Sequence, residues 1–273
     1  MMKKLSIVMS LFLAVLALTG CKEKNVPDTD PGADVSTGEL TGVFTVSGEG
    51  DKVVFAQGNL QYQATTNTWR FAENQYDAIG DANSHIAADY AGWIDLFGFG
   101  TGSNPIFTST VNADYTTFVD WGTNAISNGG NKPNTWRTLT ADEWNYLVYG
   151  RSDDTRGSAT VNGVHGYIFL PDDWTLPDGL TFTTSPNNWS VNVYSIAEWK
   201  TLEKTGAVFF PASGYREGTE LHEVGEAGEY WSSTPSYTEN ATRMTFSSGS
   251  TNTGVYGRCI GRAVRLVKNI KDN

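Results

Sequence analysis

Hydrophobic and polar residues alternate in short runs along much of this chain, a pattern typical of half-buried β-strands. Residues 92 to 131 instead mix aromatic residues with Gly and Asn without a period, which indicates long ordered loops. Many short strands and few helices predict an α+β domain with mostly antiparallel strands. The expected strands are Val43–Val46, Val53–Phe55, Leu60–Ala64, Trp69–Phe71, Gly166–Pro171, Ala207–Pro211, Tyr230–Ser233, Ala241–Ser247 and Arg262–Lys268.

Two helices are predicted by complete capping signals. Thr140 precedes Glu143 by three residues, and Ser195 precedes Glu198 in the same way, so each pair forms a capping box. A glutamate in this position already accepts a hydrogen bond from the amide of the N-cap residue, which favours capping over a role as a catalytic acid. The helices are expected to end at Gly150 and Gly206.

The segment from Tyr230 to Val267 starts and finishes as strand and carries an irregular polar pattern in between. Met244 and Phe246 alternate there with small or polar residues. We expect this segment to be a rigid frame, held from inside by its large apolar residues, whose outer face is a binding surface.

The first residues of the chain have the features of a secretory leader. Lys3 and Lys4 precede an apolar run that is too short for a comfortable membrane span and that ends in small residues before Cys21, which resembles a bacterial lipobox. Residues 1–20 are therefore expected to be a signal peptide, 21–41 a lipidated cysteine with a polar tether, 42–268 a single domain and 269–273 a tail. The alternative is a plain secretory signal followed by a chance cysteine.

Charge and cysteine content narrow the class of protein. The 273 residues carry a formal charge of −11, which argues against a surface for nucleic acid or for anionic membranes. If Cys21 is acylated, Cys259 has no partner for an intramolecular disulfide. Arg258 and Arg262 flank Cys259 and are expected to lower its thiol pKa if they lie near it in space.

Motifs for the common catalytic and metal sites are missing from the sequence. The three histidines, His85, His165 and His222, are far apart, and no Cys-x-x-Cys or Gly-x-Ser-x-Gly motif occurs. We therefore expect no metal, no cofactor and no catalytic residue. The alternative is a hydrolase or glycan-processing protein that uses carboxylates in the loops of residues 92 to 131.

Short motifs in a fixed order give the chain a resemblance to a known family. They are Asn59-Leu60-Gln61-Tyr62, Gly92-Trp93-Ile94-Asp95-Leu96-Phe97-Gly98, Trp136-Arg137-Thr138-Leu139-Thr140, Glu143-Trp144, Leu170-Pro171-Asp172-Asp173-Trp174, Pro211-Ala212-Ser213-Gly214-Tyr215-Arg216, Tyr230-Trp231-Ser232-Ser233 and Gly261-Arg262-Ala263-Val264-Arg265-Leu266-Val267. Together they resemble surface lipoproteins of gut Bacteroidetes that carry the Fibrobacter-type major paralogous domain. The resemblance implies a C-type lectin-like fold, of the branch shared with formylglycine-generating enzymes and with the variable proteins of diversity-generating retroelements.

The sequence departs from the enzymes and from the classical lectins of that fold. Formylglycine-generating enzymes use a pair of cysteines, and only Cys259 is left once Cys21 is lipidated. The calcium motifs of classical lectins, such as Glu-Pro-Asn and Trp-Asn-Asp, are also missing.

What the resemblance implies for function is display of ligand contacts on a fixed backbone. We expect a non-catalytic, monomeric lipoprotein of the outer membrane that faces the cell surface and binds an unidentified protein or glycan, with retroelement diversification of its contacts as one form of this role. Alternatives are a glycan-processing lipoprotein and a structural component of a surface assembly. For Cys259 and Ile260, the alternative to a ligand contact at the surface is burial in the core, because cysteine and isoleucine are often buried. The expected contacts are Ser236, Tyr237, Thr238, Asn240, Thr242, Arg243, Thr245, Tyr256, Arg258, Cys259 and Ile260.

Overall fold

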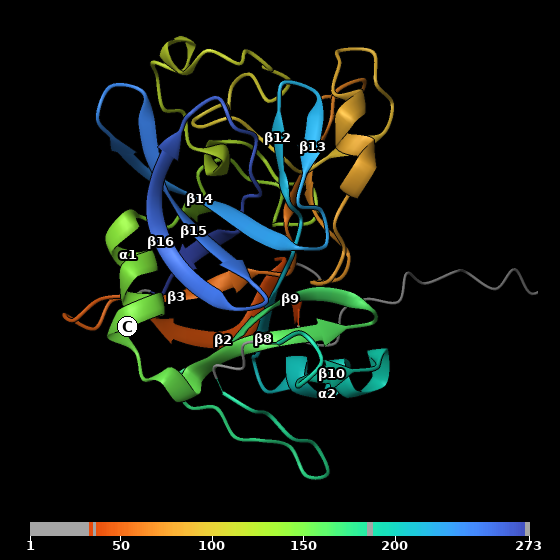
Figure 1. Cartoon of the computed structure of the whole chain (residues 1–273), viewed down its shortest axis with the longest axis vertical. Helices are drawn as coiled ribbons and strands as arrows, with labels where there is room; N and C mark the ends of the chain where they lie inside the picture. Colours follow the sequence, from red (N-terminus) through yellow and green to blue (C-terminus); the bar gives the residue numbers. More distant parts are fainter. Residues whose placement is uncertain (1–32, 35–36, 185–187, 271–273) are drawn as a thin grey trace, which may run out of the picture.

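The structure is a computed structural model that describes residues 33–34, 37–184 and 188–270 (Figure 1). The strands are β1 (Ala33–Asp34), β2 (Glu39–Thr45), β3 (Lys52–Ala56), β4 (Leu60–Gln63), β5 (Thr68–Phe71), β6 (Trp93–Ile94), β7 (Arg137–Thr138), β8 (Arg156–Val161), β9 (Val164–Phe169), β10 (Val193–Tyr194), β11 (Val208–Pro211), β12 (Tyr215–Glu217), β13 (Glu220–His222), β14 (Ala227–Ser236), β15 (Asn240–Ser247), β16 (Ser250–Gly257) and β17 (Leu266–Asn269).

Helical segments are short, and only two are α-helices within the described residues. The α-helices are α1 (Ala141–Asn145), which continues as the π-helical turn η4 (Tyr146–Gly150), and α2 (Ile196–Lys204). The 3₁₀ turns are η1 (Gly80–His85), η2 (Asn112–Asp114), η3 (Trp121–Thr123) and η5 (Asp153–Thr155). With mostly antiparallel strands, this composition confirms the predicted α+β class.

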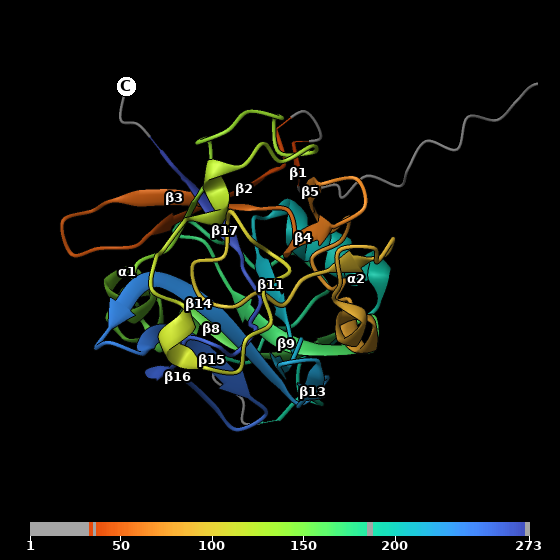
Figure 2. The same cartoon turned by 90° about the horizontal axis from the view of Figure 1, so that it is seen from above.

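The strands form several small sheets in place of one large one. Their orders are β1-β2-β3-β17-β7, β10-β8-β9-β11, β14-β15-β16, β5-β4-β6 and β12-β13. In the largest sheet β17, from the end of the chain, lies between β3 and β7, and Val267 pairs with both Phe55 and Arg137. Figure 2 shows β2, β3 and β17 close together in the view from above. The first and last described strands therefore belong to the same sheet.

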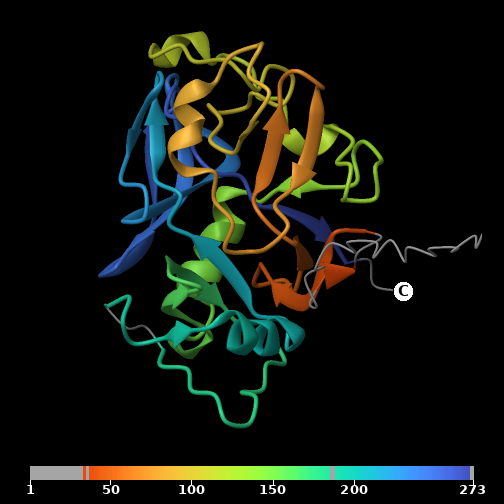
Figure 3. The same ribbon diagram turned by 90° about the vertical axis from the view of Figure 1, so that its right-hand side faces the viewer.

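The 3₁₀ turn η1 connects two of the smaller sheets. It contacts β6 of the β5-β4-β6 sheet and also β13, and Figure 3 shows this gold turn between the orange β4–β5 hairpin and the blue C-terminal strands. Asn83 in η1 is buried and donates a hydrogen bond to Asp95 just after β6, at 2.8 Å. The turn thereby fixes the beginning of the long loop region.

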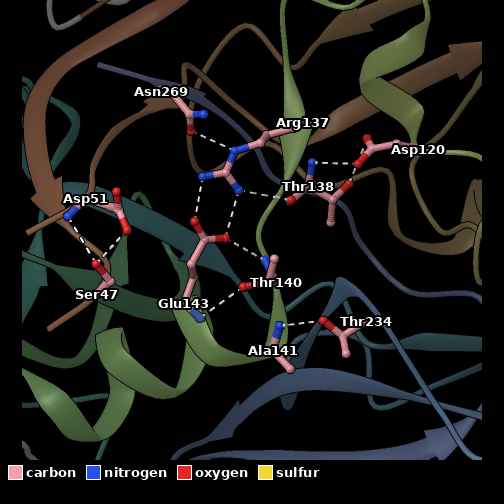
Figure 4. Close-up of polar contacts among 10 residues, drawn as sticks. All are labelled: Ser47, Asp51, Asp120, Arg137, Thr138, Thr140, Ala141, Glu143, Thr234 and Asn269. Carbon is pink, nitrogen blue, oxygen red and sulfur yellow. Dashed lines mark hydrogen bonds and ion pairs between the residues drawn. The ribbon is translucent and has the colours of Figure 1, made fainter. Parts of the chain in front are cut away.

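Both predicted helix starts are confirmed. Thr140 accepts from the Glu143 amide while Glu143 Oε2 accepts from the Thr140 amide at 2.7 Å (Figure 4). Ser195 and Glu198 form the same reciprocal pair. The hydrogen bonds from Ser195 lower the pKa of Glu198. Gly206 follows α2 with a φ of +88°, a left-handed conformation that glycine adopts without strain. The helix starts could therefore be predicted from neighbouring residues alone, without any tertiary contact.

The hydrophobic core joins the strands of the predicted frame to the rest of the chain. Tyr230, Met244 and Phe246 belong to one buried cluster with Phe55 of β3 and Trp144 of α1. Trp231, Val264 and Leu266 are buried in a second cluster with the aromatic side chains of the loop region. The expected anchoring of the segment from Tyr230 to Val267 by its apolar residues is thus confirmed.

Several element boundaries differ from the sequence prediction. Ordered structure begins before Gly42, because β2 starts at Glu39 and Leu40 is buried in the core. The expected strand from Arg262 to Lys268 is a strand only from Leu266; Arg262 and Ala263 make isolated bridges to Phe97 and Tyr230. β8 and β16 were not predicted, because their sequences contain few large apolar residues. The predicted signal peptide and the predicted lipidation site Cys21 lie outside the described residues.

Candidate functional site

The β14–β15–β16 sheet has two chemically different faces, set by its antiparallel register. Tyr230 pairs with Met244, and both side chains point into the core. The neighbouring pairs, Glu229 with Thr245 and Trp231 with Arg243, therefore point to the opposite face. We call this opposite face the cavity face and the first one the core face. Figure 1 shows α1 beside the same sheet.

A cavity of about 400 Å³ opens on the cavity face. It lies between the sheet and the β12–β13 hairpin side of the molecule, where Tyr215 contributes to the wall. Apart from Ala227 and Phe246, the side chains around it are polar or charged. They are Tyr215, Glu223, Glu229, Arg243, Thr245, Ser247, Ser250, Asn252, Tyr256 and Arg262.

Two arginines share one carboxylate at the floor of this cavity. Glu229 Oε2 lies 2.5 Å from Arg262 Nε, and Glu229 Oε1 lies 3.2 Å from Arg243 Nε. Arg262 also lies over the Trp231 ring, 4.3 Å from its centroid. Burial lowers the pKa of Arg262 to about 10, against the opposing effect of the Glu229 carboxylate, so Arg262 is still charged at neutral pH.

Arg243 differs from Arg262 in its unused hydrogen-bonding capacity. Arg262 donates to the Gly257 carbonyl as well as to Glu229, whereas Arg243 donates no hydrogen bond to any residue that the structure describes. The guanidinium of Arg243 lies 5.2 Å from the Tyr256 ring centroid. Gly254 faces it from β16, and a Cβ there would lie 3.2 Å from Arg243 Nη1, so glycine leaves room for the side chain.

The structure separates the predicted contact residues into groups. Arg243, Thr245 and Tyr256 line the cavity together. Asn240 and Thr242 alternate with Arg243 along β15 and belong to the core face, where they are half-buried. Around the β14–β15 turn lie Ser236, Tyr237 and Thr238, with Tyr237 85 % exposed.

The expectation that Arg258, Cys259 and Ile260 contact a ligand from the surface is wrong, and the alternative of burial is confirmed for Cys259 and Ile260. Their exposed fractions are 8 %, 4 % and 5 %. Arg258 donates to the carbonyl oxygens of Tyr115, Tyr237 and Asn240, so its guanidinium joins the loop region to the β14–β15 turn. These bonds give Arg258 a structural role.

Cys259 and Ile260 pack into a small cluster with Tyr115, which explains their burial. The Cys259 amide donates to Asn112 Oδ1 at 3.0 Å. Burial raises the pKa of the Cys259 thiol, and the lowering effects of Arg262 and Arg216 are smaller. The predicted lowering by Arg262 is present, but burial outweighs it, so the pKa is raised and the thiol is not activated.

Residues that the sequence did not predict as ligand contacts complete the cavity. Arg262 begins a segment predicted as strand and Glu229 directly precedes another, but their partners depend on the register between β14, β15 and the crossing segment. Asn252 lies on β16, which carries too few apolar residues to be recognised. The one available signal was the two-residue alternation that places Glu229 on the same face as Trp231.

The acids of residues 92 to 131 make local structural contacts. Buried Asp95 accepts from the Ile79 amide and from Asn83. Asp114 accepts from Ser109, and Asp120 caps η3 and accepts from the Thr138 amide at 3.0 Å (Figure 4). None of these three acids lines the 400 Å³ cavity.

A larger cavity of about 740 Å³ lies on another part of the molecule. Its wall includes Arg70, which is stacked over Trp93 at 3.9 Å and donates to Gln61. His165 also contributes, stacked on Trp189 with its Nδ1 2.8 Å from the Gly225 carbonyl. It contains none of the predicted contact residues.

Comparison with known proteins gives one match. Residues 188–267 match a family described as Domain of unknown function (DUF8237). No curated protein and no solved structure matches the chain. Every residue that lines the 400 Å³ cavity lies between Tyr215 and Arg262, inside the matched segment.

Among the described residues, no group of three or more His, Cys, Asp or Glu side chains is placed to hold a metal ion. No helix in that part of the chain is both long and apolar enough to cross a membrane.

Proposed function

We propose that this protein is a non-catalytic binding protein displayed on the cell surface, anchored by lipid on Cys21, and that its ligand contacts the cavity face. The observation that carries this proposal is the meeting of Arg243, Thr245 and Tyr256 at one 400 Å³ cavity. The sequence pattern and the family resemblance alone predict that these three residues contact a ligand. A concave site with a few converging polar groups is the usual form of a small-ligand site.

The frame under the cavity supports a display role. Trp231, Met244 and Phe246 are almost fully buried and hold the strands in place. Thr245, Asn252 and Tyr256 project from the same strands with half-buried or exposed side chains. Surface side chains of this kind can be replaced at small cost in stability, so the contacts can vary while the backbone stays fixed.

Diversification by a retroelement is part of this proposal, at fewer positions than the sequence predicts. Arg258, Cys259 and Ile260 are buried and drop out of the replaceable set. Sequencing of the DNA beside the gene tests this part. We expect a gene for a reverse transcriptase and a near-copy of the final coding segment that differs at adenines. If both are missing from the neighbouring DNA, diversification is contradicted.

A matched pair of tryptophan substitutions on β16 tests the binding surface. Asn252→Trp fills the cavity from an exposed position, whereas Val255→Trp places the same side chain on the core side of the same strand at a position that is 45 % exposed. The labelled full-length chain is applied to an array of purified polysaccharides and surface proteins. We expect Asn252→Trp to abolish the wild-type signals and Val255→Trp to retain them. Signals that survive Asn252→Trp contradict the cavity face as the binding surface.

The anchor is tested separately. Cys21→Ala should move the protein from the membrane fraction to the soluble fraction, because stable attachment requires the acyl chains. A Cys21→Ala protein that stays in the membrane fraction contradicts lipid anchoring.

A further inference from the structure

The cavity face has an imbalance of charge at its buried floor. Arg243 and Arg262 each interact with the single carboxylate of Glu229, and the three side chains are 14 %, 1 % and 9 % exposed. The other acid at the cavity, Glu223, is exposed at the rim. The full lining holds two arginines and two glutamates, but its buried part, without solvent-exposed Glu223, carries one more positive than negative charge, which favours an anionic group beside Arg243.

Arg243 is the arginine that can receive this anionic group. Arg262 is fixed by Glu229, by the Gly257 carbonyl and by stacking on Trp231. Arg243 has a single ion-pair contact with Glu229 and donates no hydrogen bond within the described chain. Because a guanidinium has five N–H donors in a fixed planar arrangement, Arg243 can bind a carboxylate through two parallel hydrogen bonds.

The rest of the cavity wall offers both hydrogen-bond donors and hydrogen-bond acceptors. Thr245, Ser247, Ser250 and Asn252 provide hydroxyl and amide groups, and the phenols of Tyr215 and Tyr256 add two more. Burying these groups against an apolar ligand would cost free energy, whereas hydroxyl groups on a ligand would satisfy them. The volume of about 400 Å³ lies at the small end of the range for small-molecule sites.

We propose that the cavity binds a carboxylate-bearing sugar, with its carboxylate on Arg243 and its hydroxyls on the Thr245 and Asn252 side of the wall. This inference rests on the proposed function and names the ligand class of the same site. An acidic peptide shares the carboxylate but brings fewer hydroxyl groups, so the hydroxyl- and amide-rich wall favours the sugar.

Calorimetry with matched disaccharides tests the carboxylate. The probes are a galacturonic acid disaccharide, the corresponding neutral galactose disaccharide and a short capped peptide of Asp and Glu, each titrated into the full-length chain. We expect the acidic disaccharide to bind at least tenfold more tightly than either other probe. Equal binding of the neutral disaccharide overturns the role of the carboxylate, and tighter binding of the peptide overturns the sugar.

Two glutamine substitutions locate the contact. Arg243→Gln should weaken binding of the acidic disaccharide at least tenfold, whereas Arg70→Gln, a partly buried arginine at the other cavity, should leave it unchanged. Thermal unfolding of each variant shows whether it is folded. Unchanged binding by folded Arg243→Gln overturns the inference.

The outcome also separates this inference from the proposed function. If the acidic disaccharide does not bind but array signals are still lost in Asn252→Trp, the ligand class is wrong and the binding surface stands. If Asn252→Trp leaves every array signal intact, the proposed function itself fails.

Discussion

Arg258 and Arg243 lie close together in the sequence, yet their surroundings give them different roles. Arg258 donates to three backbone carbonyls, and buried Arg265 likewise donates to the carbonyls of Ala56 and Phe209. Arg243 faces a cavity and donates no hydrogen bond within the described chain. A buried arginine surrounded by carbonyls stabilises the fold, and one beside an open space can bind a ligand.

Among the substitutions that test this comparison, Arg265→Met is expected to have the largest effect on stability. The substitution leaves the carbonyls of Ala56 and Phe209 and the side-chain oxygen of Asn59 without their donor in a buried site. Since each such loss costs about 1–3 kcal/mol, we expect the free energy of unfolding to fall by about 4 kcal/mol. Urea unfolding measures it, with Arg70→Met as the control. A loss no greater than that of the control contradicts the structural role of the carbonyl contacts.

The buried carboxyl group of Asp95 is expected to make the free energy of unfolding depend on pH. Burial raises the pKa of Asp95 from 3.8 to about 6, although the Ile79 amide and Asn83 oppose the shift. The folded state therefore holds this proton more tightly than the unfolded state, and stability is lost as pH rises from about 4 to about 6. The shift corresponds to about 2–3 kcal/mol.

Comparison with Asp95→Asn isolates this effect from other carboxylates. The stability advantage of the wild type over Asp95→Asn should shrink between pH 4 and pH 6 and stay constant above pH 7. Urea unfolding at a series of pH values measures both proteins. A constant difference over the whole range contradicts a raised pKa for Asp95.

Arg258→Met is expected to have a smaller effect than Arg265→Met. Two of its three acceptors, the Tyr237 and Asn240 carbonyls, lie at the exposed β14–β15 turn, where water can replace the lost donor. We expect a loss of about 2 kcal/mol. Hydrogen exchange should show faster opening of this turn, and unchanged exchange would show that Arg258 does not hold it.

Arg243→Gln is expected to have the smallest effect on stability, below about 0.5 kcal/mol. It removes one contact to Glu229 and leaves the Arg262–Glu229 pair balanced in charge. Thermal unfolding measures it beside Arg258→Met. A loss as large as that of Arg258→Met would place Arg243 among the structural arginines and remove the contrast between the two regions.

Local signals in the sequence were sufficient for the helix starts and for many strands. Thr140 with Glu143 and Ser195 with Glu198 lie within one turn of each other, so no distant contact decides their geometry. Met244 and Phe246 were recognised as inner supports because a strand alternates its faces every two residues. β16 was missed because its face toward the cavity is polar and its other face contributes little to the core.

The sequence by itself determined the α+β class, the capped helices and the apolar frame of the C-terminal segment, because these depend on neighbours along the chain. Only the tertiary structure decided which of the outward residues are accessible. Arg258, Cys259 and Ile260 are buried by Tyr115 and other residues more than a hundred positions away, while Glu229, Arg243 and Arg262 meet through strand register and a crossing segment. Burial and charge pairing depend on what packs against a side chain, and that packing is set by long-range contacts.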